Sequence, residues 1–348
     1  MTRNTLIIHN TFGSPGDPLY PSRSGVMDQV NAVAAALDNM QMPYDILPVD
    51  DIKHLTKLID SRRENIIFNL AEEFSGSIEQ ACYVPAVCTA FGKSCTGNDT
   101  PGLVLCQNKV QAKSLLSGAG LRCPSGTVIG FGQAVLLDNL EDGRYFIKPA
   151  FCDASEGIST DSVVNLPADH EKALSLIRHL QLQFGQPIIV EQFIPSRELN
   201  VSVLQRGREP KVLAIAEIDF SAFSDDMPRI VDYDAKWVAD SFGYKNTPRK
   251  IPADLDDSQR QEIERIAIHA WRAMGCRDYA RVDFRLDTDG TPYILEVNPN
   301  PDISADSGFA AALEYADITY ERFVWTVINN AVYRFEKQQE GKNTQVTK

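Results

Sequence analysis

The sequence is short of basic residues, of long hydrophobic runs and of any export signal. Its 348 residues include 34 Lys and Arg against 47 Asp and Glu, a formal net charge of −13. A general nucleic-acid-binding protein needs a basic face to neutralise phosphates, so this charge argues against that class. No apolar run reaches the ~20 residues that span a membrane as a helix, and the N-terminus shows no signal-peptide pattern. We therefore expect no nucleic-acid partner and no membrane partner.

Cysteine spacing and glycine motifs exclude two further classes. The seven cysteines are odd in number and form no C-x-x-C pair, which is typical of reduced thiols in a cytoplasmic protein and not of a disulfide framework or a zinc site. No G-x-G-x-x-G motif follows the first predicted strand, so a dinucleotide-binding domain is not indicated. The hydrophobic fraction of 43% is that of a folded protein, and the length predicts more than one domain.

The first third of the chain alternates apolar strands with an amphipathic helix. Strands are predicted at 6–8, 44–49 and 65–70, with a loop over 15–25 and a helix over 26–37. This order and spacing favour a parallel, doubly wound α/β sheet.

Alternating elements continue through the rest of the chain. The remaining predicted strands lie at 126–129, 145–149, 187–193, 198–204 and 212–218. The predicted helices cover 107–118, 169–182 and 258–274, and the polar tail from residue 336 is expected to fray.

The most informative stretch is a predicted hairpin over 279–301. Period-two alternation places Asp283 on one face of the first strand and puts Ile294, Glu296 and Asn298 together on the return strand. Asp283, Glu296 and Asn298 then converge and all present oxygen. Oxygen ligands of this kind suit Mg²⁺, which binds through one or two carboxylates together with substrate phosphates.

Two other interpretations of this hairpin compete with a magnesium site. The pattern of Asp287, Asp289, Gly290 and Glu296 partly matches a calcium loop, but the first ligand position would be Arg285, which is not acidic. The charges could equally belong to an ordinary solvated face, because charged residues are mostly exposed.

Motifs in the last third resemble the C-terminal signature of the ATP-grasp superfamily, and within it the D-alanine–D-alanine ligase family. They are Arg281-Val-Asp-Phe, Leu295-Glu-Val-Asn-Pro-Asn-Pro and Asp306-Ser-Gly-Phe. Upstream elements resemble the family in the same order: Cys106-Gln-Asn-Lys109, Phe146-Ile-Lys-Pro-Ala, Asp153-Ala-Ser-Glu-Gly-Ile, Val190-Glu-Gln-Phe-Ile-Pro-Ser-Arg-Glu and Asp232-Tyr-Asp-Ala-Lys236.

The resemblance covers roughly residues 65–335 and implies a three-domain α/β fold of the ATP-grasp type. The expected domains are a doubly wound N-terminal domain over 1–104, an α+β central lid domain over 105–195 and an α+β C-terminal catalytic domain over 196–348. ATP would lie between the second and third domains, and a homodimer through the N-terminal domain is the expected assembly.

The resemblance also implies a role for each matching residue. The metal ligands would be Asp283, Glu296 and Asn298, holding two Mg²⁺ ions, for which Mn²⁺ could substitute. The ATP-binding residues would be Lys109, Lys148, Ser155 and Gly157 at the phosphates, Glu191, Phe193 and Ile194 at the adenine, and Glu198 at the ribose. The catalytic residues would be Lys236 at the γ-phosphate, Arg281 at the oxyanion, and Ser307 with Gly308 at the carboxylate of the second substrate.

Three linked positions depart from the family pattern at the first-substrate site. Gly25 stands near the Glu that holds the ammonium of D-alanine, Ala154 replaces its Ser partner, and Trp237 replaces the loop Tyr. Glu72, Glu73 or Asp28 could bind a cation instead.

We therefore predict an ATP-dependent carboxylate–amine ligase that works through an acylphosphate on small-molecule substrates, with its donor specificity altered from D-alanine. The alternatives are a D-alanine–D-alanine ligase of cell-wall synthesis, an ATP-binding pseudoenzyme, or a phosphotransferase that stops after phosphorylating an acceptor.

Overall fold

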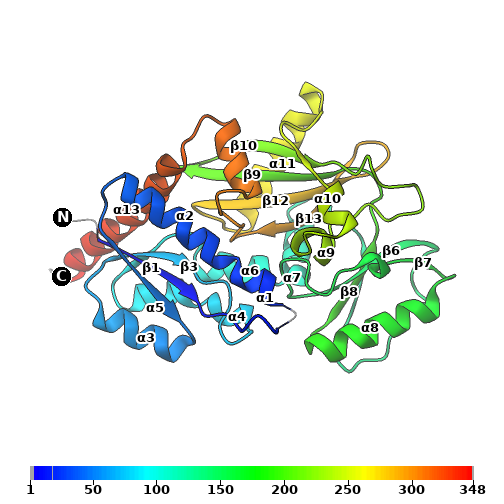
Figure 1. The fold of residues 1–348 in the computed structure, drawn as a ribbon, viewed down its shortest axis with the longest axis horizontal. Helices are drawn as coiled ribbons and strands as arrows, with labels where there is room; N and C mark the ends of the chain where they lie inside the picture. Colours follow the sequence, from blue (N-terminus) through cyan, green and yellow to red (C-terminus); the bar gives the residue numbers. More distant parts are fainter. Residues whose placement is uncertain (1–3, 18, 347–348) are drawn as a thin grey trace.

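The computed structural model describes residues 4–17 and 19–346 and contains three sheets that follow one another along the chain (Figure 1). The first sheet is parallel and the other two are antiparallel. This α/β architecture confirms the fold class expected from the sequence motifs.

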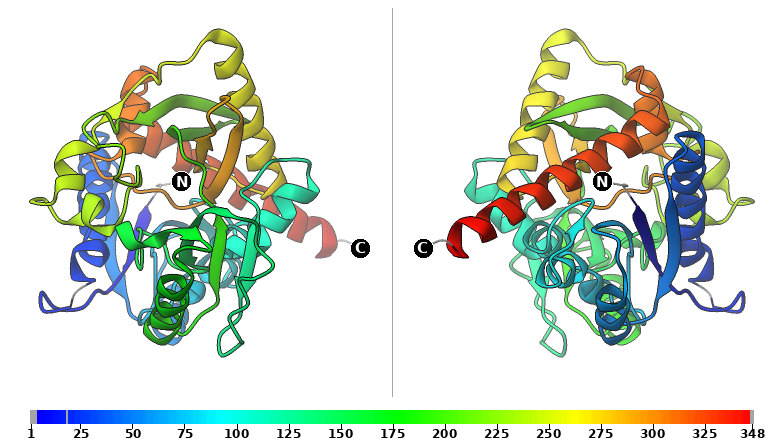
Figure 2. Two further views of the ribbon diagram at one scale, coloured as in Figure 1. Left: turned by 90° about the vertical axis from the view of Figure 1, so that its right-hand side faces the viewer. Right: turned by 90° about the vertical axis from the view of Figure 1, so that its left-hand side faces the viewer.

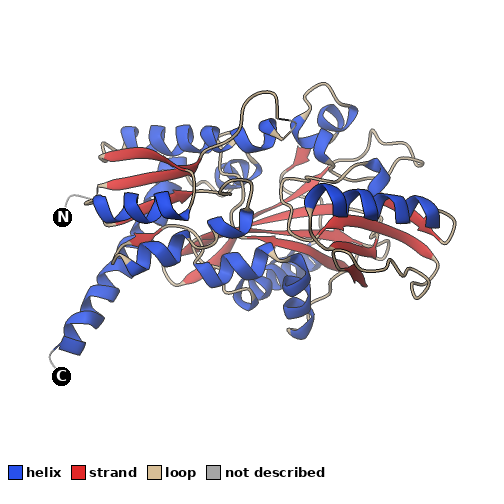
Figure 3. Ribbon diagram, turned by 90° about the horizontal axis from the view of Figure 1, so that it is seen from below, coloured by secondary structure: helices blue, strands red, loops and turns tan. Residues whose placement is uncertain are grey.

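The first sheet is built from short apolar strands with helices on both faces (Figure 3). Its order is β2 (Tyr44–Val49), β1 (Thr5–Asn10), β3 (Ile66–Leu70) and β4 (Ser94–Cys95). Because strand side chains alternate, Ile7 packs on the side of α2 (Val26–Asn39), whereas Leu6 and Ile8 pack on the side of α3 (Ile52–Ser61) and α5 (Val84–Ala90). The doubly wound sheet predicted for this region is confirmed.

The second sheet follows two connecting helices and is covered by one helix. The chain reaches it through α6 (Thr100–Gln107) and α7 (Lys109–Gly118). The strand order is β5 (Gly126–Ile129), β8 (Ile188–Gln192), β6 (Gly143–Pro149) and β7 (Val163–Leu166). The helix α8 (His170–Phe184) packs Ala173, Ile177 and Leu180 against this sheet.

The third sheet carries the hairpin that the sequence singled out. Its order is β11 (Arg249–Lys250), β10 (Glu209–Ile218), β9 (Glu198–Arg206), β12 (Tyr279–Leu286) and β13 (Pro292–Asn298). The helix α11 (Asp257–Ala273) is capped by Asp256, whose side chain accepts a hydrogen bond from the N–H of Gln259, and it buries Ile263 and Trp271 against the sheet.

The last two helices connect the third sheet with the first. The helix α12 (Gly308–Tyr315) packs against β10, and α13 (Tyr320–Val346) packs against α2 and β3 and then extends past the body of the molecule (Figure 2). One core cluster therefore contains Ile7 and Phe68 from the first sheet together with Tyr279 and Phe323 from the C-terminal part. The expected fraying from residue 336 is wrong as far as Val346, because α13 continues to that residue.

Short elements escaped prediction because each is too short to carry a hydrophobic period. They are α1 (Tyr20–Ser24), which lies inside the expected loop, α4 (Ile78–Ala81), η1 (Thr160–Ser162), α9 (Tyr233–Trp237) and α10 (Phe242–Asn246).

A β-bulge corrects the predicted faces of the hairpin. Glu296 lies opposite Asp283, but Ile294 lies opposite Phe284, so that Leu295 is an extra residue on β13. Ile294 consequently joins Phe284 in the buried core and does not share the face of Glu296. The period-two prediction that grouped Ile294 with Glu296 and Asn298 is therefore wrong for Ile294.

Candidate active site

The hairpin brings its four predicted site residues onto one face of the third sheet. Asp283 lies opposite Glu296, and Arg281 lies opposite Asn298. The Arg281 guanidinium donates two hydrogen bonds of 2.7 Å to the two oxygens of Asp283. Asn200, on the neighbouring strand β9, donates a third at 3.0 Å to Oδ1 of the same carboxylate. This network fixes the orientation of Asp283 before any ligand binds.

The oxygens of these residues fit a divalent cation. An oxygen of a carboxylate or amide has two lone pairs. Oδ1 of Asp283 accepts two hydrogen bonds, but Oδ2 accepts only one, and Oδ1 of Asn298 accepts only one, at 2.9 Å from the N–H of Asn300. Each therefore keeps a lone pair, and Glu296 can add its carboxylate. Within the described part of the chain, three or more His, Cys, Asp or Glu side chains do not gather as a metal site, so an ion here would use two carboxylates and one amide.

Glu296 is the focus of a cluster of cations. Its Oε2 atom lies 3.5 Å from Nζ of Lys109. Burial alone would raise the pKa of Glu296, but Lys109, Lys148, Arg281 and Lys236 together lower it to about 2. The carboxylate therefore stays ionised, and the surrounding positive charge suits a phosphate-bearing ligand.

Lys109 begins α7 and is held under the loop that follows β6. Asn108 caps this helix by accepting a hydrogen bond from the N–H of Gln111, which places Lys109 in the first turn. Its Nζ atom donates to the carbonyl of Cys152 at 2.6 Å and to Asp153 at 3.2 Å. Burial would lower the pKa of Lys109, but Asp153 and Glu296 outweigh it and raise the pKa, so the side chain stays charged.

Lys148 and Glu191 form a buried triad with a residue that the sequence did not single out. Glu191 lies 2.8 Å from Nζ of Lys148 and 2.9 Å from Nζ of Lys113. Burial would raise the pKa of Glu191, but the two lysines lower it. Lys113 follows Lys109 by one helical turn, so an i, i+4 search from Lys109 would have found it.

The predicted adenine and ribose residues gather at the end of β8 and the start of β9. Phe193 is buried with the Arg285 guanidinium 5.0 Å from its ring centroid, and Ile194 is buried beside it. Glu198 forms an ion pair of 3.1 Å with Arg285. Burial raises the pKa of Glu198, although Arg285 opposes this. Phe146 stacks on Phe193 at a centroid distance of 6.4 Å.

The predicted phosphate loop is held in a left-handed backbone conformation. Ala154 and Ser155 have φ angles of 55° and 61°, which non-glycine residues adopt at a cost. The loop residue Gly157 has a φ angle of 77°, and a Cβ there would lie 2.8 Å from Phe184 and from Pro149. The hydroxyl of Ser155 donates to the carbonyl of Val231 at 2.9 Å, which ties this loop to the segment before α9.

Lys236 projects from that segment on α9. Lys236 as a whole residue is exposed, but its charged amino group is surrounded by protein and by the charged side chains of the site. Burial and Arg281 lower the pKa of Lys236, whereas Glu296 and Asp283 oppose them. The charge of Lys236 therefore interacts with Arg281 and with the two carboxylates of the hairpin.

Ser307 and Gly308 form the start of α12. The hydroxyl oxygen of Ser307 accepts a hydrogen bond of 3.1 Å from the N–H of Ala310, so Ser307 is the N-cap. A Cβ on Gly308 would lie 3.1 Å from Nε of Arg249, a residue that the sequence did not single out.

Of the three positions that depart from the family pattern, Trp237 lies next to the other two. The Trp237 ring faces Gly25, where an added Cβ would lie 3.5 Å from the ring. The indole N–H of Trp237 donates to the carbonyl of Ala154 at 2.9 Å. One aromatic side chain therefore joins α1, the phosphate loop and α9.

Carboxylates gather near this contact. Glu72 accepts a hydrogen bond of 2.7 Å from Gln29, and burial raises its pKa to about 7. Glu73 lies 3.5 Å from Arg23. Asp28 is exposed in the first turn of α2. Among the three cation-binding candidates, Glu72 has the environment most altered from water.

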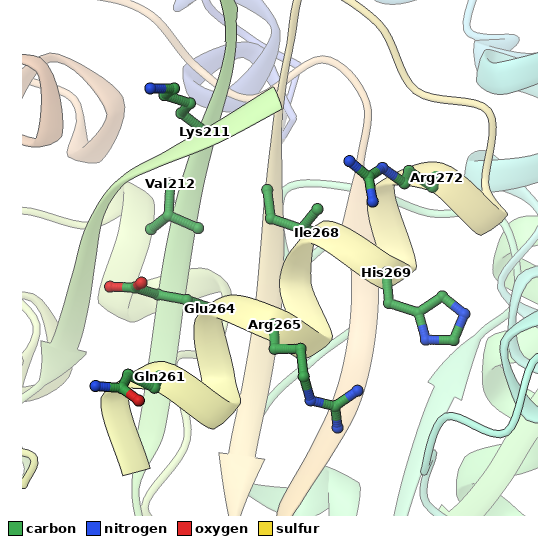
Figure 4. Close-up of a pocket in the computed structure, with 8 residues that line it drawn as sticks. All are labelled: Lys211, Val212, Gln261, Glu264, Arg265, Ile268, His269 and Arg272. Atoms are coloured by element: carbon green, nitrogen blue, oxygen red, sulfur yellow. The ribbon is translucent and has the colours of Figure 1, made fainter. Parts of the chain in front are cut away.

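Two open hollows lie away from this cluster. One, of about 700 Å³, lies between β10 and α11 and is lined by residues such as Lys211 and Arg265, whose charged ends point in different directions (Figure 4). The other, of about 610 Å³, lies beside α2 and α12. No predicted site residue lines either hollow.

None of the helices in the described ranges 4–17 and 19–346 is both long and apolar enough to cross a membrane.

Comparison with known proteins places the chain in a family. A family model described as "D-ala D-ala ligase C-terminus" matches residues 144–329. The chain is 28% identical over 294 residues to a D-alanine–D-alanine ligase of Xanthomonas axonopodis pv. citri (strain 306), covering 83% of this chain and 85% of that one. It is 29% identical over 337 residues to the uncharacterized protein y4sG of Sinorhizobium fredii (strain NBRC 101917 / NGR234), covering 94% of each.

Solved structures give the same fold. The D-alanine–D-alanine ligase from Bacillus anthracis complexed with ATP superposes with a TM-score of 0.74 at 17% identity, over 97% of this chain and 99% of that chain. The D-alanine–D-alanine ligase from Coxiella burnetii gives a TM-score of 0.72 at 16% identity, over 100% of this chain and 99% of that chain.

Proposed function

The chain belongs to the D-alanine–D-alanine ligase family of the ATP-grasp superfamily, and from this premise we propose that it joins an acyl donor other than D-alanine to an amine acceptor. It is an ATP-dependent carboxylate–amine ligase. We also propose that the three domains meet between residues 104 and 105 and between residues 195 and 196.

The reaction needs charge neutralisation more than covalent help from the protein. The donor carboxylate attacks the γ-phosphorus of ATP, the β,γ-bridging P–O bond breaks, and ADP leaves. The acceptor amine then attacks the carbonyl carbon of the acylphosphate, inorganic phosphate leaves with the electrons of the C–O bond, and the nitrogen loses a proton. Both steps move negative charge through the region between Lys109, Lys148 and the hairpin.

Each predicted residue has a place in these steps. Asp283, Glu296 and Asn298 would hold the magnesium ions, which supply charge neutralisation at the phosphates when bound. Lys109, Lys148 and the backbone of the loop with Ser155 and Gly157 would hold the ATP phosphates, and Lys236 would reach the transferred group. Glu191, Phe193, Ile194 and Glu198 would line the nucleoside site. Arg281 would stabilise the oxyanion, and Ser307 with Gly308 would bind the acceptor carboxylate.

The proposed change in donor specificity is supported mainly by the contacts of Trp237 with Gly25 and Ala154. The indole fills the volume in front of Gly25, and the hydroxyl group of the family's Ser is absent at Ala154. An ammonium group needs oxygen partners when it leaves water. The indole N–H is itself a donor and is already bonded, so this corner offers D-alanine no acceptor side chain.

Glu72 is the carboxylate that can take over recognition of a donor cation. It is hydrogen-bonded by Gln29, and Asp302 and Asp153 add negative potential around it, which together with burial keeps its pKa near 7. A cationic group would favour the ionised form of Glu72 and would be stabilised in return.

The test is phosphate and ADP release from the purified enzyme with ATP and Mg²⁺, over pairs drawn from D- and L-amino acids, hydroxy acids and small carboxylates. We expect turnover with a donor other than D-alanine, and mass spectrometry of the product should show an amide. Tight ATP binding without turnover for any pair would contradict the proposal, and so would a phosphorylated product that no amine consumes.

D-alanine–D-alanine ligase activity is the second candidate, favoured by the names of the relatives and solved structures. Efficient formation of D-alanyl-D-alanine by the wild-type enzyme would select this function over the first.

A further inference from the structure

Lys113 is a buried lysine with no part in the two reaction steps. It lies on α7, and its Nζ atom is 2.9 Å from Oε2 of Glu191 on β8. The side chain of Lys113 is 14% exposed and that of Glu191 is 3% exposed. Among the described residues, no other carboxylate lies within ion-pair distance of Lys113. Charged side chains are rarely buried unless they are paired, so this ion pair connects α7 to the second sheet.

Glu191 has a lysine at each of its two oxygens. Lys148, on β6, lies 2.8 Å from Oε1, while Lys113 lies at Oε2. Burial lowers the pKa of Lys148, Glu191 raises it, and the positive charge of Lys113 again lowers it. Two cations therefore share one carboxylate, and one of them can leave without removing the last counter-charge of Glu191.

Lys148 has two anions to neutralise once ATP is bound. Its proposed place is at the phosphates, yet its Nζ atom also pairs with Glu191. If Lys148 were the sole partner of Glu191, its move to the phosphates would leave a buried carboxylate without a counter-charge, which is strongly unfavourable. With Lys113 in place, Glu191 keeps one counter-charge and Lys148 is available to the phosphates.

We propose that Lys113 is a positioning residue that stays paired with Glu191 when Lys148 moves to the phosphates of ATP, and that it raises the affinity for ATP in this way. This inference rests on the proposed placement of Lys148 and Glu191 in the ATP site and adds a residue that acts through them. Because Lys113 acts by releasing Lys148, its contribution belongs to the phosphates and not to the base. The contribution also requires the carboxylate of Glu191.

The first test measures dissociation constants by titration calorimetry with Mg²⁺ and without donor or acceptor. Lys113→Met should weaken ATP binding at least about tenfold, as for loss of a charge-assisted hydrogen bond, because Lys148 then stays at Glu191. Adenosine, which has no phosphates, is measured by displacement of ADP and should bind within about twofold of its wild-type affinity. Unchanged ATP affinity in Lys113→Met, or an equal loss for adenosine, would overturn the proposal.

Lys172→Met is the matched control, because this lysine of α8 pairs with Asp161 at 2.7 Å on the exposed surface and should not affect ATP binding. A further variant tests the route through Glu191. In Glu191→Gln no carboxylate holds Lys148, so adding Lys113→Met should change the ATP affinity by no more than about twofold. This double variant leaves no unpaired carboxylate, so it serves even if Lys113→Met alone does not fold. An equally large loss of ATP affinity in the Glu191→Gln background would reject the role of Lys113. Neither donor nor turnover enters these measurements, so such a result would leave the proposed donor specificity standing.

Discussion

The indole N–H of Trp237 donates a hydrogen bond of 2.9 Å to the carbonyl oxygen of Ala154. The same ring stands 3.5 Å from the place where a Cβ of Gly25 would be. Because one side chain contacts both partners, the three departures from the family pattern act as a unit. In the proposed function, these three positions would therefore alter the donor pocket together.

The first prediction concerns a variant that carries the residues of the family pattern at positions 25, 154 and 237. The variant Gly25→Glu/Ala154→Ser/Trp237→Tyr should raise kcat/KM for D-alanine as donor by at least about tenfold, because a carboxylate and two hydroxyl groups then become available to the ammonium. Phosphate release with D-alanine as the varied donor measures this.

Gly25→Glu alone is the matched control for that prediction. Its new side chain meets the Trp237 ring, so it should not improve D-alanine use, and the three changes should be strongly non-additive. Equal effects of the single and triple variants would mean that Trp237 does not occupy the donor pocket.

The second prediction concerns Glu296. Replacing it with Gln removes a carboxylate of the proposed metal site and the negative charge that Lys109 and three other cations stabilise. We expect kcat at saturating Mg²⁺ to fall by a factor of about 100 or more. Asp289→Asn, at the exposed turn of the same hairpin, should leave kcat unchanged. Near-normal activity of Glu296→Gln would remove Glu296 from the metal site.

The pKa of Glu296 also predicts a pH effect on the ligand-free protein. A carboxyl whose pKa falls from 4.5 to about 2 on folding stabilises the native state above pH 4.5, and this contribution disappears as the pH falls toward 2. Glu296→Gln should therefore be less stable than wild type at pH 7, with a smaller difference at lower pH. Urea unfolding without nucleotide measures this, and greater stability of the variant at pH 7 would contradict it.

The third prediction has the opposite sign and concerns Glu72. Its pKa rises from 4.5 to about 7 on folding, so ionised Glu72 opposes folding and the native state is favoured by protonation. Glu72→Gln should match wild type below pH 4.5 and become progressively more stable than wild type between pH 4.5 and 7, and the difference should level off above pH 7 at about 3 kcal/mol. Urea unfolding at several pH values measures the difference. Glu141→Gln, in an exposed loop, should show no such trend.

The sequence predicted the elements whose pattern is local. The apolar strands of the first sheet and the stripe of α11 follow from periodicity, and the hairpin follows from alternation around an Asp-Gly turn. The bulge at Leu295 was not predictable, because one extra residue changes the face of every side chain beyond it without altering the local composition.

Contacts between distant segments explain two features of the candidate site that the sequence missed. Arg249 reads as an ordinary charged residue until folding places it beside Gly308. The contact of Trp237 with Gly25 joins the C-terminal third to the first helix, and no local pattern records it. Lys113 differs from these two, because its helical spacing from Lys109 was visible in the sequence.

The last prediction concerns the junction that holds the first sheet against the third. Asp278 is fully buried and accepts hydrogen bonds from Arg334 at 2.8 and 2.7 Å, from Asn330 at 3.1 Å and from the N–H of Gly97 at 2.8 Å. Its φ angle of 58° is left-handed, a region that Asn also tolerates, so Asp278→Asn changes the charge without adding backbone strain.

Asp278→Asn should lower the free energy of unfolding by about 3–5 kcal/mol, because Arg334 is left buried without its counter-charge. Urea unfolding measures this, and Asp225→Asn, which breaks an exposed pair with Arg229, should leave stability unchanged. Arg334 lies on α13, which also packs against α2, the helix that follows Gly25, so the KM for the donor should rise in Asp278→Asn below its unfolding temperature. A stability loss with an unchanged KM would mean that the donor pocket keeps its shape without this junction.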